Sequence, residues 1–335
     1  MSTTVVCISP ITSDIEAYLK EGFSGDSIKI IQPIKDDRTD LLKCVSNADV
    51  LIGWNSDLEI LKAAVKLKLF INPSTGVSQH IENFRSIKND RDIVLVNGHG
   101  HAYAVAQHCV SLLLSLSNAI VPHHHKMANR LITKPPQRNF ILKDITIGFL
   151  GYGAINRQVH KMLSGFEVKF AACKRSWSTE ELSPPTNLKC YKADQIDKCF
   201  ITSDVVINAL PYTSMTHQLI GKKHFESLGN KGLFINIGRG STVVEKALFN
   251  ALETKTIAAA ALDVWWPQPK EERIEGLFQP FKLPFHELKN LVMSPHRAAD
   301  NPDSLERWDE VIENINCLHE GRSDFLNIVN LDLEY

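Results

Sequence analysis

A glycine turn in the middle of the chain is the segment whose residue types point most directly to a chemistry. Residues 145–150 form a continuous apolar run typical of a buried strand, the turn follows at once, and a helix-like segment covers 157–163. A strand–turn–helix unit of this kind binds pyrophosphate, because glycines let the backbone approach and the helix N-terminus offers N–H groups. We therefore expect a dinucleotide cofactor to bind at Gly151, Tyr152, Gly153, Ala154 and Ile155.

The turn departs from the usual fingerprint at its third glycine position, which is occupied by Asn156. That glycine ordinarily allows close packing of the helix on the strand. The sequence gives no reason for asparagine here. The prediction therefore depends on the strand before the turn and the helix after it, since a lone pair of glycines also occurs in ordinary tight turns.

The end of the next predicted strand bears on which dinucleotide binds. The strand at 168–173 is followed by Lys174, Arg175 and Ser176. NAD-specific sites usually place an acidic residue here, where it binds the ribose 2′-hydroxyl. Two cations and a hydroxyl suit the additional 2′-phosphate of NADP, since a guanidinium binds phosphate through a fork of N–H donors. We expect NADP rather than NAD, with a solvated basic loop as the alternative.

Three further polar motifs also come directly after predicted strands, where α/β enzymes place their site residues. They span residues 234–241, 261–269 and 293–299. The first contains Arg239, whose side-chain type grips a carboxylate with two hydrogen bonds. The last contains His296, whose side-chain type exchanges protons near neutral pH. Taken singly, a helix-capping arginine and a surface histidine are the alternatives.

Together with residues 72–77, residues 104–108 and the glycine turn, these motifs resemble the D-isomer-specific 2-hydroxyacid dehydrogenase family over nearly the whole chain. The resemblance implies that Arg239 holds the substrate carboxylate and polarises its carbonyl. It implies that His296 is the acid/base and that Asp263 binds the nicotinamide side of the cofactor. It also implies backbone contacts to substrate from Thr75, Gly76 and Val77, and cofactor contacts from Pro211, Thr216 and Ile237.

Gln268 is a departure from this family, which usually has glutamate paired with the histidine. A neutral amide orients the imidazole but cannot raise its pKa by charge. Formate dehydrogenases of the same superfamily carry glutamine in a similar sequence, and formate oxidation moves no alcohol proton. Gln268, which we expect to orient His296, is thus compatible with formate chemistry as well.

Other positions argue against simple formate chemistry. Formate dehydrogenases place asparagine where this chain has His101, and they tend to be NAD-specific. A substrate role for His99 and His101 and a polar loop that opens a helix both stay open. The segment 270–290 is longer than usual; it either covers the site or supplies Glu271 or Glu272 as a substitute carboxylate.

The leading hypothesis is an NADPH-dependent reductase of small 2-oxo acids, such as glyoxylate or hydroxypyruvate, to D-2-hydroxy acids. A dehydrogenase of formate or of a small oxyanion such as a phosphonate is the first alternative. A non-catalytic NADP-binding sensor on the same fold is the second.

Short apolar runs alternate with helix-like segments along the chain and predict parallel sheets covered on both faces. We expect two doubly wound Rossmann-like α/β domains, with the cofactor domain inserted into the substrate domain and the site in the cleft between them. The boundaries are 1–98 plus 300–335 for a flavodoxin-like substrate domain and 99–299 for the dinucleotide-binding domain. One long helix is predicted over 101–129 and corresponds to the family's dimerisation segment, so the resemblance implies a homodimer.

Composition narrows the function classes. The 335 residues are enough for two cores, and the net charge of −1 gives no general attraction to nucleic acid or to a membrane. The seven cysteines form no CxxC pair, so we expect reduced thiols, a cytoplasmic location and no metal site. We also expect neither a signal peptide nor a membrane span. The run His123-His124-His125 is not expected to bind metal, because adjacent helical residues point in different directions.

Overall fold

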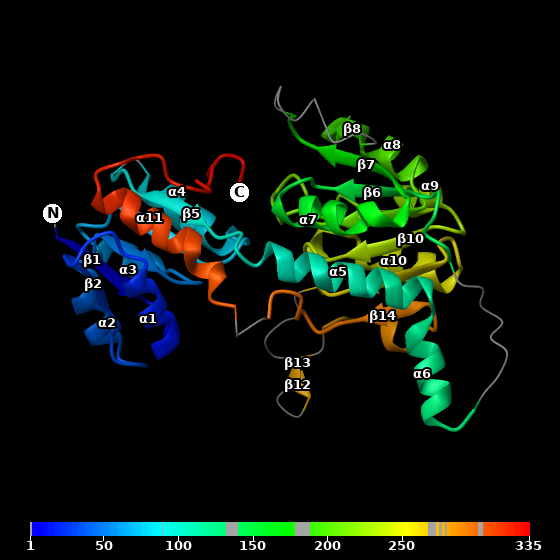
Figure 1. Cartoon of the computed structure of the whole chain (residues 1–335), viewed down its shortest axis with the longest axis horizontal. Coiled ribbons are helices and arrows are strands. Elements are labelled where there is room, and N and C mark those ends of the chain that lie inside the picture. Colours follow the sequence, from blue (N-terminus) through cyan, green and yellow to red (C-terminus); the bar gives the residue numbers. More distant parts are fainter. Residues whose placement is uncertain are drawn as a thin grey trace. The chain divides into compact units, whose positions relative to one another are not determined.

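The computed structural model describes residues 2–88, 90–131, 140–177, 188–266, 280–300 and 304–335, and the short strands β12 (Arg273–Ile274) and β13 (Leu277–Phe278). The chain forms two compact units (Figure 1). The first comprises Met1–His101 with Asn301–Tyr335, and the second is Ala102–Asp300. The chain therefore leaves the first unit once and returns to it.

The first unit is built on a five-stranded parallel sheet in the order β2-β1-β3-β4-β5. This order is that of flavodoxin-like folds. The strands are β1 (Thr3–Cys7), β2 (Ile28–Ile31), β3 (Val50–Ile52), β4 (Leu69–Asn72) and β5 (Val94–Asn97). The helices between them are α1 (Ser13–Glu21), α2 (Arg38–Val45), α3 (Leu58–Ala63) and α4 (Ser78–Ile87). Side-chain oxygens of Thr12, Asp37 and Asp57 cap the first three helices and thereby define where they begin.

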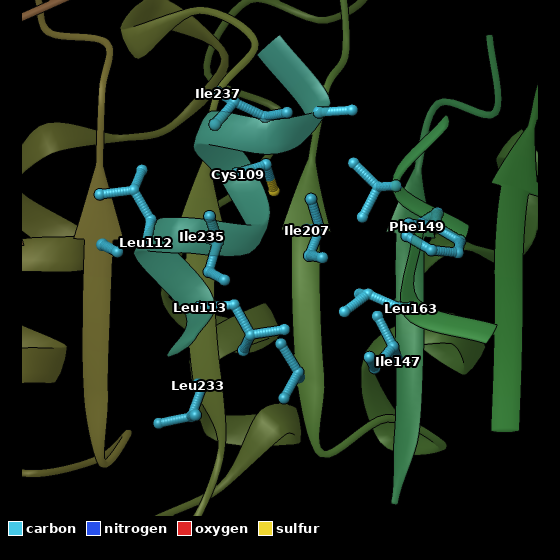
Figure 2. Packing of buried hydrophobic residues seen from close by; sticks show 14 of the residues in the cluster. Cys109, Leu112, Leu113, Ile147, Phe149, Leu163, Ile207, Leu233, Ile235 and Ile237 are labelled. Atoms are coloured by element: carbon cyan, nitrogen blue, oxygen red, sulfur yellow. The ribbon is translucent and has the colours of Figure 1, made fainter. Parts of the chain in front are cut away.

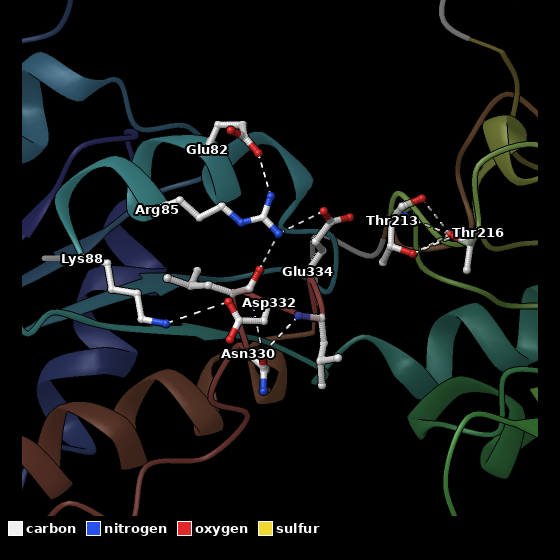
Figure 3. A network of polar contacts seen from close by, with 10 residues as sticks. Glu82, Arg85, Lys88, Thr213, Thr216, Asn330, Asp332 and Glu334 are labelled. Atoms are coloured by element: carbon white, nitrogen blue, oxygen red, sulfur yellow. Dashed lines mark hydrogen bonds and ion pairs between the residues drawn. The ribbon is translucent and has the colours of Figure 1, made fainter.

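The C-terminal segment completes the first unit. Helix α11 (Asp309–His319) packs Val311 and Ile315 into the same cluster of buried side chains as Val5. Beyond it, the N–H of Val329 donates to the carbonyl of Leu95 at 2.9 Å. The guanidinium of Arg85 in α4 donates to the carbonyl of Leu331 at 2.8 Å and pairs with Glu334 at 3.1 Å (Figure 3).

The second unit contains a seven-stranded parallel sheet in the order β14-β11-β10-β9-β6-β7-β8. Its strands are β6 (Thr146–Leu150), β7 (Lys169–Lys174), β8 (Leu188–Lys192), β9 (Val205–Asn208), β10 (Leu233–Asn236), β11 (Ala259–Leu262) and β14 (Leu291–Met293). Its helices are α5 (Ala102–Ser117), α6 (Ile120–Ala128), α7 (Ala154–Leu163), α8 (Ile196–Ile201), α9 (Lys222–Leu228) and α10 (Glu245–Glu253). The strand order reverses between β6 and β9, as in dinucleotide-binding sheets, which bind their ligand at that point. The predicted fold class is confirmed.

Helix α5 and the sheet of the second unit share one hydrophobic core. Cys109, Leu112 and Leu113 lie on one face of α5 at helical spacing, and they face Ile207 and Ile235 of the central strands (Figure 2). All five side chains are at most 5% exposed. This packing holds α5 firmly against the strands whose ends carry the candidate site.

The expected continuous helix over 101–129 is wrong. Instead α5 ends at Ser117, α6 begins at Ile120, and the two axes are bent by 66°. Ala119 between them adopts a left-handed conformation (φ 49°, ψ 38°), which interrupts the helical hydrogen-bond ladder. Within the described ranges, no single helix is long and apolar enough to cross a membrane, although this bent pair passes a test of length and composition when its helices are taken together.

Candidate functional site

The candidate residues of the second unit gather at one edge of its sheet. The strands β14, β11, β10, β9 and β6 are consecutive neighbours and run parallel, so their carboxyl ends meet at the same edge. The segments that follow them are the glycine turn, the loop 209–216, Ile237–Arg239, Asp263 and Ser294–His296. Sites of doubly wound folds lie at such an edge.

The glycine turn has the geometry that a pyrophosphate needs. Gly151 has φ +76°, and its N–H donates to the carbonyl of Cys173 at 2.9 Å. A Cβ on Gly151 would lie 3.2 Å from the carbonyl oxygen of Ala209, a tight contact, so the dihedral favours glycine and the space adds to that preference. Gly153 is the N-cap residue of α7, no side chain caps this helix, and a Cβ at Gly153 would meet no described atom within 4 Å. The backbone is thus open to a close ligand at a helix N-terminus, which fits the phosphates of a dinucleotide.

The predicted 2′-phosphate residues lie beside this turn. The bond from Gly151 to Cys173 joins the turn to the residue before Lys174, which ends β7. The Lys174 ammonium lies 5.8 Å from the centroid of the Trp177 ring. Arg175 and Ser176 follow directly, so two cations extend from the strand next to the turn.

The loop after β9 closes on itself through two threonines. The Thr216 hydroxyl donates to the carbonyl of Pro211 at 2.6 Å, and the Thr213 N–H donates to the Thr216 hydroxyl at 2.8 Å (Figure 3 draws the threonine pair). The N–H of Ile237 donates to the carbonyl of Asn208 at 3.0 Å, and its side chain is buried. The structure therefore brings the predicted cofactor residues Pro211, Thr216 and Ile237 to the same sheet edge as the turn.

Arg239 is positioned by the glycines on both sides of it. A Cβ on Gly238 would lie 2.6 Å from the carbonyl oxygen of Leu210, and one on Gly240 would collide with the carbonyl of Trp265. The backbone on either side of Arg239 therefore packs directly against the backbone of two other loops. Only glycine, which has no Cβ, allows so close an approach. Its Nη1 donates to the carbonyl of Gly238 at 2.7 Å.

A buried polar network that the sequence motifs did not indicate holds the Arg239 backbone. The Asn208 amide donates to Asn236 Oδ1 at 3.0 Å and to Thr242 Oγ1 at 2.8 Å. The Thr242 hydroxyl in turn donates to the carbonyl of Arg239 at 2.7 Å. All three side chains are fully buried. The available signal was an asparagine at the end of each of two apolar strands.

The Arg239 guanidinium has no carboxylate partner among the described residues. Its side chain is half-buried, and burial lowers its pKa from the usual value. No described Asp or Glu forms an ion pair with it. A desolvated cation without a countercharge is costly unless an anion completes it. The position therefore suits an anionic substrate.

Asp263 holds the segment that carries His296. Its carboxylate is 1% exposed, and Oδ1 accepts from Ser294 Oγ at 2.6 Å and from the N–H of Arg297 at 2.9 Å. Oδ2 accepts from the N–H of Ala298 at 3.1 Å. His108 Nε2 lies 2.9 Å from Ser294 Oγ and extends this network to α5. Asp263 was predicted from the family resemblance, whereas the roles of Ser294 and His108 in holding it were not.

His296 lies exposed at the sheet edge in a left-handed backbone conformation, with φ +57°. Desolvation by neighbouring atoms lowers its pKa, the positive charge of Arg239 lowers it further, and the negative charge of Asp263 opposes both. The side chain's exposure screens these effects. The charges of Arg239 and Asp263, at the same sheet edge, therefore both act on the pKa of the imidazole. Gln268, Glu271 and Glu272 lie outside the described residues.

The predicted substrate residues of the first unit also come together. Thr75 Oγ1 lies 3.0 Å from His101 Nε2, and the Asn97 amide donates to the carbonyl of Thr75 at 2.8 Å. The carbonyl of Gly76 accepts from the Asn72 amide at 2.9 Å, and Val77 is the N-cap residue of α4. These contacts order the loop after β4.

The two neighbouring histidines have different surroundings. The His99 N–H donates to Glu310 at 2.5 Å, and its ring lies 3.1 Å from Asn327 Oδ1, whereas His101 contacts Thr75. His99 therefore anchors the C-terminal segment. In the part of the chain that the structure describes, no group of three or more His, Cys, Asp or Glu side chains is arranged to hold a metal ion.

Residues 110–298 match the sequence model of the D-isomer specific 2-hydroxyacid dehydrogenase NAD-binding domain, which is more than half of the chain. The chain belongs to this family. It is therefore an NAD(P)-dependent dehydrogenase or reductase that acts on CH–OH groups.

Relatives of the enzyme differ in their substrates. A glyoxylate reductase of Thermofilum pendens is 29% identical over 284 residues, 82% of this chain and 79% of the relative. A glyoxylate/hydroxypyruvate reductase B of Enterobacter is 27% identical and covers 88% of each chain. A formate dehydrogenase of Chaetomium thermophilum is 26% identical over 80% of this chain and 72% of its own.

Solved structures share the fold of the enzyme. A D-isomer specific 2-hydroxyacid dehydrogenase of Xanthobacter autotrophicus in complex with NADPH and MES superposes with a TM-score of 0.80 at 20% identity, over 100% of both chains. An NADPH-dependent glyoxylate/hydroxypyruvate reductase of Sinorhizobium meliloti has a TM-score of 0.79 at 20% identity, again over 100% of both.

Proposed function

We propose that the enzyme is an NADP-dependent reductase that converts a small 2-oxo acid, such as glyoxylate or hydroxypyruvate, to the D-2-hydroxy acid. One observation carries the proposal. A half-buried Arg239 without a described carboxylate partner lies close enough to His296 to lower its pKa, at the same sheet edge as the glycine turn. The names of the glyoxylate and hydroxypyruvate reductases among its relatives support the substrate class.

The cofactor assignment rests on the turn and the strand beside it. Residues 151–155 hold the pyrophosphate with backbone N–H groups, and Lys174, Arg175 and Ser176 bind the 2′-phosphate. Pro211, Thr216, Ile237 and Asp263 line the path toward the nicotinamide. NADPH, when bound, supplies the hydride. NAD is the less favoured cofactor because no acid ends β7.

Arg239 and His296 carry the chemistry on the substrate. Arg239 binds the carboxylate with two N–H donors and polarises the adjacent carbonyl. From the first unit, we propose that the backbone of Thr75, Gly76 and Val77 binds the substrate carboxylate and that His101 binds the substrate as well. His296 gives a proton to the carbonyl oxygen as it becomes an alcohol, and Gln268 orients the imidazole.

A panel of 2-oxo acids tests this proposal. Glyoxylate, hydroxypyruvate and larger homologues are mixed with NADPH and the purified enzyme, and loss of absorbance is followed. At least one acid should be reduced, and chiral analysis of the products from hydroxypyruvate and the larger acids should show the D-form, since glycolate from glyoxylate is achiral. Binding of NADPH without oxidation by any acid would contradict the proposal.

A dehydrogenase of formate or a small oxyanion is the second candidate. Two observations favour it. Among the described residues, Asp263 is the carboxylate whose charge raises the pKa of His296. The glutamate that the family usually pairs with this histidine is replaced by Gln268. The related formate dehydrogenase adds to this. Reduction of NADP by formate or by a phosphonate would support this candidate, and inactivity with both would remove it. If Arg239→Ala left every measurable activity and ligand response unchanged, both catalytic candidates would fall, and the non-catalytic sensor would be the remaining one.

The proposal also assigns a role to each domain. Residues 99–299 bind the cofactor, and residues 1–98 with 300–335 contribute the substrate loop. We further propose a cytoplasmic homodimer formed through α5 and α6, where Tyr103, Ile120 and Met127 are more than half exposed. Light scattering on the purified protein tests the dimer, because a monomeric mass at micromolar concentration would contradict it.

A further inference from the structure

The third glycine position of the turn is occupied by a buried side chain that bonds back to the turn. Asn156 is fully buried in the first turns of α7. Its Nδ2 donates to the carbonyl of Gly151 at 2.5 Å and to the carbonyl of Leu150 at 3.3 Å. The NH₂ group of the amide is therefore directed at the last residue of β6 and the first residue of the turn.

A second residue of the same helix face holds the next residue of the turn. His160 is one helical turn beyond Asn156, so the two side chains lie on the same side of α7. Its Nδ1 lies 2.6 Å from the hydroxyl of Tyr152, and its ring packs on Phe170 with centroids 4.0 Å apart. Both partners of this hydrogen bond are buried. Three consecutive residues, 150–152, are thus held from α7 by side-chain hydrogen bonds.

These bonds determine how the turn presents its amides. The carbonyl of Gly151 points to Asn156, and in a planar trans peptide the N–H of the following residue points the opposite way. The N–H of Tyr152 is therefore directed away from the Asn156 amide. Asn156 Oδ1 has no hydrogen-bond partner among the described residues, which costs stability. The side chain thus acts through its two donated bonds.

We propose that Asn156 and His160 are positioning residues that lock residues 150–152 in the shape that binds the dinucleotide pyrophosphate. The pair, here called the turn clamp, takes the place of the third glycine. In the usual fingerprint, close helix–strand packing alone shapes the turn. In this enzyme, hydrogen bonds from the helix shape it. The proposal rests on dinucleotide binding at the glycine turn.

The test compares cofactor affinity in matched variants. The Kd of NADPH is measured by fluorescence titration for Asn156→Ala, Asn156→Gly and Tyr152→Phe, together with KM values for NADPH and for the 2-oxo acid. Losing the Asn156 bonds should raise the Kd about tenfold, as expected for about 1.4 kcal/mol. Tyr152→Phe should raise it about threefold, because it loses one hydrogen bond. The KM for the 2-oxo acid should change less than about twofold, because the substitutions weaken binding of the cofactor and not of the acid. Asn250→Ala, at an exposed position of α10, is the control that should leave the Kd unchanged.

The possible outcomes distinguish the turn clamp from a purely structural role of Asn156 and from a failure of cofactor binding. Wild-type affinity in Asn156→Gly would show that glycine suffices and would overturn the clamp. A lower Tm with an unchanged Kd would make Asn156 merely structural and would overturn it as well. If the Asn156 variants do not fold, Tyr152→Phe decides alone, since it removes a single oxygen. If the wild-type enzyme itself binds no dinucleotide, cofactor binding at the turn fails, a result distinct from a variant that binds normally.

Discussion

The N–H of Arg297 donates to Asp263 Oδ1 over 2.9 Å, directly after His296, whose φ is +57°. A left-handed conformation of a non-glycine residue costs on the order of 1–3 kcal/mol and persists only where the surroundings enforce it. The buried carboxylate of Asp263 supplies that enforcement through three donors from residues 294–298. The aspartate therefore determines where the proposed proton donor lies.

Asp263→Asn should accordingly weaken catalysis by displacing His296. An amide places an NH₂ group against at least one of the donors that the carboxylate accepts, so one hydrogen bond becomes a repulsion. We expect kcat/KM to fall at least about tenfold, with a lower Tm. Steady-state kinetics and thermal denaturation check this. Asp300→Asn is the control: Asp300 pairs with Arg297 at the surface, and its loss should change kcat/KM less than about twofold.

The pH profile should report the lowered pKa of His296. Reduction of a 2-oxo acid needs the protonated imidazole, so kcat/KM is full below its pKa and falls tenfold per pH unit as the pH rises through it. Because desolvation by neighbouring atoms and the charge of Arg239 lower this pKa, the midpoint should lie below the ordinary histidine value. In Asp263→Asn the midpoint should move further down, since the opposing negative charge is gone. A midpoint that moves up would contradict this assignment of charges.

Cofactor preference should depend on the two cations after β7. Lys174→Asp with Arg175→Ser replaces cations by an acid at the position that binds the ribose of NAD. We expect the ratio of kcat/KM for NADPH to that for NADH to fall by about a hundredfold, as two charge-assisted contacts are lost. Lys169→Asp, at the exposed opposite end of the same strand, is the matched control. An unchanged ratio in the double variant would show that these cations do not touch the 2′-phosphate.

Thr242→Val should disturb Arg239 without touching it. The substitution keeps the volume but removes the hydroxyl that accepts from Asn208 and donates to the carbonyl of Arg239. The buried unpaired groups should cost about 1–3 kcal/mol of unfolding free energy. The KM for the 2-oxo acid should rise, because the guanidinium is less well placed. Thr254→Val, at an exposed helix end, should change neither quantity appreciably; if the KM is also unchanged in Thr242→Val, the network does not position Arg239.

The strands of both sheets were largely predictable, because a strand buried on both faces is a continuous apolar run. The edge strand β8 (Leu188–Lys192) was missed, since two exposed lysines interrupt its apolar residues and it is covered less fully. The bend between α5 and α6 was also missed. Ala119 is a good helix former, so its left-handed conformation has no signal in residue type.

Candidate site residues were predictable where a side chain of a suitable type directly follows a predicted strand, as for Arg239 and His296. The groups that hold them were not, because their contacts join residues distant in sequence. The hydrogen bond from Asn208 to Asn236 depends on the register of β9 with β10, and that between His108 and Ser294 depends on how α5 packs on the sheet. Asn156 could be seen to break the fingerprint, but its two bonds to the turn required the geometry.

The most direct test of the proposed function is the single-turnover reduction of glyoxylate and hydroxypyruvate by NADPH, with wild-type enzyme, Arg239→Lys and Arg239→Ala compared. A lysine keeps the charge but loses the bidentate grip, so we expect an intermediate loss of the single-turnover rate at subsaturating 2-oxo acid for lysine, and a loss of at least about a thousandfold for alanine. NADPH affinity should stay within about twofold in all three proteins. Equal rates in the wild-type enzyme and Arg239→Ala, at equal NADPH occupancy, would contradict the assignment of Arg239 to the substrate carboxylate.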